Sequence, residues 1–257
     1  MVEHIEAEQF HSFTATGYSR PARVTCSRQD GTKVDVFVKF AGGVRHREFG
    51  LSSELLCNLL ARAFGLHTPT PFLVTVSKEF LAGIPAPARD LVGRSRGLNY
   101  GSQSAPVGFS VVPPEPQVPH ELRSEAARIF AFDVIVQNYD RKADNPNLLW
   151  DRRTILLIDH ESAFGPMLQE RKPSFSALEL DRFYDHVFYP AISPQDAGFE
   201  ELLAAMQSFS AARLEETLGQ IPPPWQVEAG WARVREHLVW VLEHRDQVCR
   251  LIRERLT

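Results

Sequence analysis

The sequence has few cysteines and no long apolar segment. The three cysteines are far apart and odd in number, at positions Cys26, Cys57 and Cys249. That spacing fits neither a disulfide framework nor a zinc site, and it predicts reduced thiols in a cytoplasmic protein. No apolar run approaches the roughly 18 residues that a membrane-spanning helix needs. A disulfide-stapled scaffold and a membrane-spanning protein are therefore not expected.

A charge excess of either sign is also missing. Lys and Arg number 28 against 32 Asp and Glu, which gives a formal net charge of -4. This balance gives no signal for a nucleic-acid partner or an anionic membrane surface. The N-terminus is acidic and lacks the basic-then-apolar pattern of a signal peptide. With 257 residues, 44% of them hydrophobic, the chain is long enough to bury one or two cores.

The most informative stretch combines a buried helix, a polar loop and a hairpin. The helix is predicted over residues 120–137, and the polar loop after it contains Asp140 and, five positions later, Asn145. Two short apolar segments predict a hairpin over residues 148–158. Asp159 ends the second segment, so this layout places the three polar side chains at the same end of one small sheet.

These three side chains suit phosphoryl transfer from a nucleotide. One carboxylate, Asp140, would orient the proton of the incoming hydroxyl, while Asn145 and Asp159 would hold Mg²⁺ against the phosphates. The Asp-x4-Asn spacing with an Asp after the next hairpin is the outline of the protein-kinase catalytic and metal-binding loops. Because polar turns are rich in both residues, the spacing alone is weak, and the hairpin that ends in Asp159 strengthens the interpretation.

A lysine and a glutamate upstream are candidates for the nucleotide site. A hairpin is predicted over residues 22–40, and Lys39 lies near the end of its second strand among apolar neighbours. Lys39 is either a surface lysine with its charged end in water or the strand lysine that holds nucleotide phosphates. Glu54 lies in a helix predicted over residues 47–64, beside small or polar residues that leave room to reach Lys39. The alternative for Glu54 is a solvated helix glutamate.

The loop over residues 15–21 contains a single glycine, far short of a glycine-rich phosphate loop. Gly17, Ser19 and Arg20 are nevertheless candidates for nucleotide contacts through backbone N–H groups, a hydroxyl and a positive charge. An ordinary turn into the following strand is the alternative.

Residues 83–119 are rich in proline and glycine and predict a loop-rich connector. Its one strand-like piece spans residues 108–112. We interpret this piece as the segment that joins the two halves of the protein. The backbone of Phe109, Ser110 and Val111 is then predicted to bond the edge of the adenine.

Three motifs resemble the HipA-like kinase family: Asn138-Tyr139-Asp140-Arg141, Asn145-Pro146-Asn147-Leu148-Leu149 and Ile158-Asp159-His160. The catalytic loop is also similar to that of the phosphatidylinositol kinases. Two departures from ordinary protein kinases fit the HipA-like group better. Asn138-Tyr139 stands where His-Arg would precede the Asp, and His160-Glu161 stands where Phe-Gly would follow it. Upstream, Val-Phe-Val-Lys, ending at Lys39, is similar to the kinase Val-Ala-Ile-Lys.

The resemblance implies an α+β, two-lobed protein-kinase-like fold. The small β-rich N-lobe is expected over residues 1–112 and the mostly helical C-lobe over residues 113–257. The C-terminal helices are predicted at 197–209, 211–218 and 228–256. The resemblance further implies ATP and Mg²⁺ as cofactors, the Lys39–Glu54 pair as part of the ATP site, and a serine or threonine of a protein as the acceptor.

Other functions remain open from the sequence alone. A phosphatidylinositol or small-molecule kinase would keep the same catalytic groups and change only the acceptor site. A metal-dependent hydrolase would use Asp140, Asp144, Asp159 and His160 as metal ligands. Against the hydrolase, no His-x-x-x-His pair accompanies these residues, and Lys39 and Glu54 would have no role. A nucleotide-binding regulator without catalysis would not need Asp140.

Overall fold

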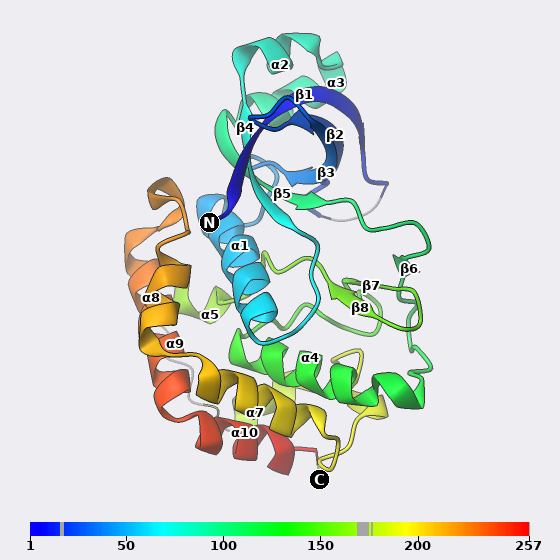
Figure 1. Ribbon diagram of the computed structural model, residues 1–257, viewed down its shortest axis with the longest axis vertical. Helices are drawn as coiled ribbons and strands as arrows, with labels where there is room; N and C mark the ends of the chain where they lie inside the picture. Colours follow the sequence, from blue (N-terminus) through cyan, green and yellow to red (C-terminus); the bar gives the residue numbers. More distant parts are fainter. Residues whose placement is uncertain (16–17, 169–174, 176, 257) are drawn as a thin grey trace.

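The structure is a computed structural model and describes residues 1–15, 18–168, 175 and 177–256. Strands predominate in the first part of the chain and helices in the rest, which confirms the α+β class. Figure 1 shows the strands β1 to β5 at one end of the molecule and most helices at the other. Among the helices of these described residues, none is both long and apolar enough to cross a membrane.

The N-terminal strands close into a barrel in the order β1-β2-β3-β5-β4. Their bounds are Glu3–Phe13 (β1), Ala22–Ser27 (β2), Lys33–Lys39 (β3), Pro71–Val76 (β4) and Gly97–Gln103 (β5). The parallel pairing of β1 with β4 closes the barrel. Side chains alternate along a strand, so Val36 and Val38 of β3 enter the barrel core together with Val24 of β2. The predicted hairpin over residues 22–40 is confirmed.

Two barrel strands were missed by the sequence patterns. β1 carries charged residues on its solvent side, and only Ile5 and Ala7 are buried among its eleven residues. β5 has the sequence Gly-Leu-Asn-Tyr-Gly-Ser-Gln, without a β-branched residue, and it forms by pairing with β3 and β4. The expected loop-rich connector therefore contains a strand, together with helix α3 over Ala86–Gly93. The short helix α2, Lys78–Gly83, precedes it.

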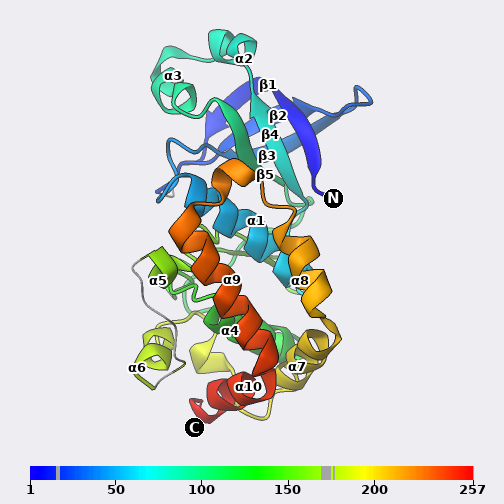
Figure 2. The same ribbon diagram turned by 90° about the vertical axis from the view of Figure 1, so that its left-hand side faces the viewer.

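Helix α1, Glu48–Ala63, joins the barrel to the helical part of the molecule. It packs against β5 on one side and against α8, Ala211–Leu218, on the other. Both views show α1 between the barrel and the helices (Figures 1 and 2). Gly65, which follows the end of this helix, adopts a φ of 75°, the left-handed conformation that ends many helices.

A second, small sheet lies beside helix α4, Arg123–Ile135, and has the strand order β6-β7-β8. Its strands are Ser110–Val111, Leu148–Trp150 and Ile155–Leu157. The hairpin predicted over residues 148–158 is thus confirmed. A 3-10 helix, His120–Leu122, precedes α4 and completes the predicted helical segment.

Most of the remaining chain is helical. The helices are α5 (Gly165–Leu168), α6 (Ala177–Leu180), α7 (Gly198–Ser208), α9 (Glu228–Glu243) and α10 (Arg245–Glu254), with 3-10 turns at Asp181–Phe183, Tyr189–Ala191 and Pro223–Trp225. The prediction of a single helix over residues 228–256 is wrong, because two helices, α9 and α10, occupy this range. The chain turns at His244, whose φ of -113° and ψ of 21° leave the helical region. The His244 ring stacks on Trp240 at this turn.

Candidate active site

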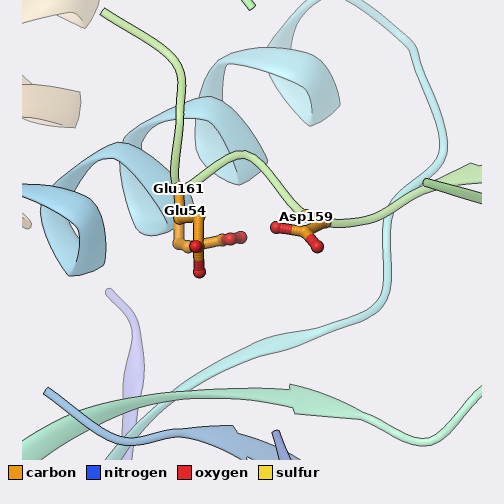
Figure 3. A group of neighbouring side chains, drawn as sticks. All are labelled: Glu54, Asp159 and Glu161. Carbon is orange, nitrogen blue, oxygen red and sulfur yellow. The ribbon is translucent and has the colours of Figure 1, made fainter. Parts of the chain in front are cut away.

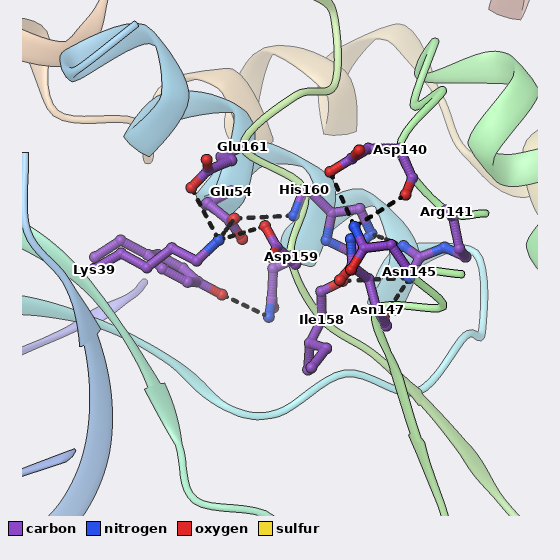
Figure 4. A network of polar contacts seen from close by, with 12 residues as sticks. Lys39, Glu54, Asp140, Arg141, Asn145, Asn147, Ile158, Asp159, His160 and Glu161 are labelled. Atoms are coloured by element: carbon purple, nitrogen blue, oxygen red, sulfur yellow. Dashed lines mark hydrogen bonds and ion pairs between the residues drawn. The ribbon is translucent and has the colours of Figure 1, made fainter. Parts of the chain in front are cut away.

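Lys39, the last residue of β3, is surrounded by three carboxylates. Its Nζ atom donates to Glu54, to Asp159 Oδ1 at 2.6 Å and to Glu161 Oε2 at 3.2 Å. Figure 3 shows the three acidic side chains converging, and Figure 4 shows Lys39 among them. The Lys39 side chain is only 8% exposed and that of Glu54 only 2%. A surface lysine in water and a solvated helix glutamate are therefore both excluded.

Glu54 also ties the helix to the loop after β8. The backbone N–H of His160 donates to Glu54 Oε1 at 2.9 Å, and the Ser53 hydroxyl donates to the Ala163 carbonyl at 3.1 Å. Gly50 lets the start of α1 approach the preceding loop, because a Cβ there would lie 2.3 Å from the Arg45 carbonyl oxygen. These contacts hold β3, α1 and the loop after β8, which carries Asp159 and Glu161, in one fixed arrangement.

The cluster shifts the pKa values of its members. Burial raises the pKa of Glu54 to about 7, with the Lys39 ammonium opposing and the charge of Asp159 adding to the rise. Burial also disfavours the charged forms of Lys39 and Asp159. The attraction between the Lys39 ammonium and the Asp159 carboxylate outweighs this effect of burial. The pKa of Lys39 is therefore raised and that of Asp159 is lowered. Lys39 therefore stays an ammonium and Asp159 a carboxylate at neutral pH.

Asp140 and Asn145 lie together in the loop after α4. The Asn145 Nδ2 atom is 3.4 Å from Asp140 Oδ2 and 3.4 Å from the Asp140 carbonyl oxygen (Figure 4). Burial raises the pKa of the Asp140 carboxyl, the charge of Asp159 adds to the rise, and Arg45 opposes it.

The backbone at Asp159 is strained, and the Arg141 side chain holds the neighbouring carbonyl groups in place. Asp159 has a φ of 62° and Asn147 a φ of 50°, both in the left-handed region, a conformation often found at functional sites. Arg141 donates through Nη1 to the carbonyl of Asn147 and, at 3.3 Å, to that of Ile158. Arg141 was predicted only as part of a motif, without a role of its own. Its position directly after Asp140 was the available signal.

The residues predicted in the first loop have contacts of their own. Ser19 is buried, and its carbonyl oxygen lies so close to Gly43 that a Cβ there would be 2.9 Å away. The Arg20 guanidinium lies 4.8 Å from the centre of the Phe13 ring. Gly17 lies outside the described residues. The nucleotide contacts of these residues stay predictions.

The segment predicted to contact adenine belongs to the second sheet. Ser110 and Val111 form β6 and pair with β7, where Val111 lies opposite Leu149. The Phe109 N–H donates to the Pro106 carbonyl at 3.3 Å. This segment lies in the chain between β5 and α4, and the adenine contact of its backbone stays a prediction.

The ligand set of a metal-dependent hydrolase is not supported by the surroundings of His160. Its Nε2 atom accepts from Arg141 Nη2 at 3.0 Å, and burial lowers its pKa to about 3. The carboxylates that do converge are those of Glu54, Asp159 and Glu161, with ligand atoms within 4.8 Å of one another. Asp159, whose side chain is 29% exposed, offers the most accessible hard oxygen ligand of this group for Mg²⁺.

A barrel lysine paired with a helix glutamate, next to an acidic loop and an Asp–Asn loop, is the arrangement of phosphotransferases with a protein-kinase-like fold. The HipA-like kinase family matches residues 11–245 of this chain. The chain therefore belongs to the HipA-like kinases, and the resemblance inferred from its motifs is confirmed.

One solved structure shows the same fold. The proinflammatory kinase CtkA of Helicobacter pylori is similar with a TM-score of 0.57 at 11% identity, covering 96% of this chain and 95% of that chain. The structure of the open conformation of CtTel1 matches with a TM-score of only 0.31 at 13% identity, over 96% of this chain and 11% of that chain. No curated protein matches the chain.

Proposed function

We propose that this protein transfers the terminal phosphoryl group of ATP to a serine or threonine of a protein, with Mg²⁺ as the metal. Its membership of a kinase family supports the phosphotransferase activity. The observation that carries the proposal is the contact of the buried Lys39 ammonium with both Glu54 and Asp159. A lysine for phosphates and a carboxylate for metal then meet at one point, as phosphoryl transfer requires.

We further propose two lobes, residues 1–112 and 113–257. The barrel and α1 lie in the first range, and α4, β7, β8 and the later helices lie in the second. Strand β6 ends at Val111 and pairs with β7, so it links the first range to the second. In this proposal the nucleotide binds between the lobes.

Each group of the cluster then has a role. Lys39 binds the phosphates, and Glu54 holds the Lys39 ammonium in place. The donor set of Asp159 and Asn145, a carboxylate and an amide oxygen, fits Mg²⁺. When bound, the metal would neutralise charge on the phosphates.

Asp140 is the group that orients the acceptor hydroxyl and accepts its proton. Burial raises its pKa, which makes the carboxylate a stronger base than an exposed one. Gly17, Ser19 and Arg20 are proposed to contact the phosphates, and the backbone of Phe109, Ser110 and Val111 the adenine. We also propose a cytoplasmic location, which the three buried free cysteines support.

The acceptor class is tested by labelling. The purified protein is incubated with γ-labelled ATP and Mg²⁺, with and without cell lysate, and labelled species are separated into protein, lipid and small-molecule fractions. Phosphoserine or phosphothreonine in a protein band supports the proposal. Label that enters only the lipid or small-molecule fraction would identify the protein as a phosphatidylinositol kinase or a small-molecule kinase instead. The Asp140→Asn variant serves as the inactive control.

A further inference from the structure

Glu161 occupies a position in the cluster that the motif comparison does not explain. It stands two residues after Asp159, and ordinary protein kinases have glycine there. Its side chain is 7% exposed and contacts the Lys39 ammonium at 3.2 Å. It thus adds a third buried or partly buried carboxylate to the lysine, beyond the pair that the proposed function uses.

The Lys39 ammonium has no donor left for a phosphate in this arrangement. An ammonium carries three N–H groups, and Lys39 has three carboxylate partners. Glu54 and Glu161 are buried, whereas Asp159 is more exposed at 29%. Asp159 is therefore the partner that can turn away towards a cation most easily.

The charges of the cluster are also unequal. One ammonium faces the carboxylates of Glu54, Asp159 and Glu161. A nucleotide phosphate that approaches Lys39 is repelled by this excess negative charge, and low solvent exposure strengthens the repulsion. A divalent cation beside Lys39 would offset this excess of negative charge. Without Glu161, the imbalance would be smaller by one charge.

We propose that Glu161 makes nucleotide binding at this site depend on a divalent cation. The proposal rests on the proposed function. Without a cation, Glu161 keeps a Lys39 donor occupied and its charge repels the phosphates. With a cation, Asp159 turns from Lys39 and frees one N–H for a phosphate oxygen, while Glu54 and Glu161 keep the ammonium in position.

Titration calorimetry with ADP tests this inference without any turnover. The dissociation constant for ADP is measured with excess Mg²⁺ and with excess EDTA, and their ratio gives the dependence on the cation. The Glu161→Gln variant keeps the shape and removes the charge, so the ratio should fall roughly tenfold, chiefly through tighter binding without metal. The Glu161→Asp variant keeps the charge and should keep the ratio within about twofold of the wild type.

Glu216 supplies a matched control. It is an exposed glutamate of α8, and Glu216→Gln makes the same change in net charge away from the cluster. Its ratio should equal that of the wild type. Thermal unfolding of each variant verifies folding, and if Glu161→Gln does not fold, Glu161→Ser removes the same charge with a smaller side chain.

The outcomes separate the two proposals. A wild-type protein that binds no ADP under either condition and transfers no phosphate contradicts the proposed function. A wild type that binds ADP with Mg²⁺, together with a Glu161→Gln ratio equal to the wild-type ratio, overturns only the role of Glu161. A ratio that falls equally in Glu161→Gln and Glu161→Asp also overturns it, because the charge would then not be the cause.

Discussion

The Nε atom of Arg141 lies 2.5 Å from Oδ2 of Asp133, and neither side chain has exposed surface. His186 Nε2 also contacts Asp133 Oδ2 at 3.0 Å, and Asn138 Nδ2 donates to Oδ1 at 2.9 Å. Because Arg141 follows Asp140 directly, this buried pair fixes the loop that presents the proposed catalytic carboxylate. Asp133 is thereby a structural hydrogen-bonding group of helix α4.

Breaking the Arg141–Asp133 pair should lower the free energy of unfolding of the protein. Arg141→Met leaves the Asp133 carboxylate buried without its main cation and leaves the Asn147 and Ile158 carbonyls without their donor. We expect a loss of about 3–5 kcal/mol in the free energy of unfolding, measured by urea denaturation. An unchanged urea midpoint would show that the pair does not hold the loop.

Lys39→Ala should lower both transfer and stability. The Lys39 side chain is only 8% exposed, so its charge contributes to stability as a buried ion-pair partner and not as a surface charge. Removal of this buried ammonium leaves Glu54 and Glu161 without their cation. Transfer should fall by orders of magnitude, and thermal unfolding should occur at a lower temperature.

A matched control for Lys39→Ala lies in the same strand. Lys33 is 51% exposed and pairs with Glu8 across the barrel surface, so Lys33→Ala should change stability by less than about 1 kcal/mol. Wild-type turnover in a folded Lys39→Ala protein would contradict the proposed role of Lys39.

Stability should fall in mild acid because His237 is buried as a neutral ring. Burial lowers its pKa from 6.5 to about 4, with the bond to the Ile135 carbonyl opposing. Between these values the unfolded chain binds a proton at this site and the folded protein does not. Stability is therefore lost as the pH falls through 6.5, by about 1.6 kcal/mol from this residue between pH 6.5 and pH 5.

The His237→Gln variant isolates that contribution. Its side-chain amide can still donate to the Ile135 carbonyl but does not titrate in this range. Urea denaturation at pH 6.5 and pH 5 should show a smaller loss of stability in the variant than in the wild type, by about 1.6 kcal/mol. Equal losses in the two proteins would show that His237 titrates normally in the folded state.

Local patterns predicted the elements that carry the motifs. Alternating valines marked β3, helical spacing marked α1, and two short apolar runs marked the hairpin before Asp159. Strand β5 could not be found this way, since most of its residues have low strand preference and its neighbours in the barrel select the conformation.

The site residues likewise divide into those that local motifs mark and those that only contacts distant in the chain reveal. The chain order of Lys39, Glu54, Asp140, Asn145 and Asp159 could be compared with a kinase pattern, so these residues could be predicted as a site. Glu161 could not, because nothing in the spacing shows that its carboxylate turns back to Lys39. The buried partners of Arg141 were missed for a related reason, since His186 is 45 positions away from it in the chain and only folding brings Asp133 between them.

Two isosteric variants, Asp140→Asn and Asp159→Asn, separate the proposed catalytic and metal-binding roles. Titration calorimetry with ATP, with and without Mg²⁺, is run beside a transfer assay on the wild type and both variants. Asp140→Asn should bind ATP and Mg²⁺ like the wild type while transfer falls by a large factor, because only the charge at the acceptor is lost. Asp159→Asn should lose Mg²⁺-dependent ATP affinity together with transfer. If Asp140→Asn abolishes ATP binding while Asp159→Asn remains active, the proposed assignment of roles is wrong.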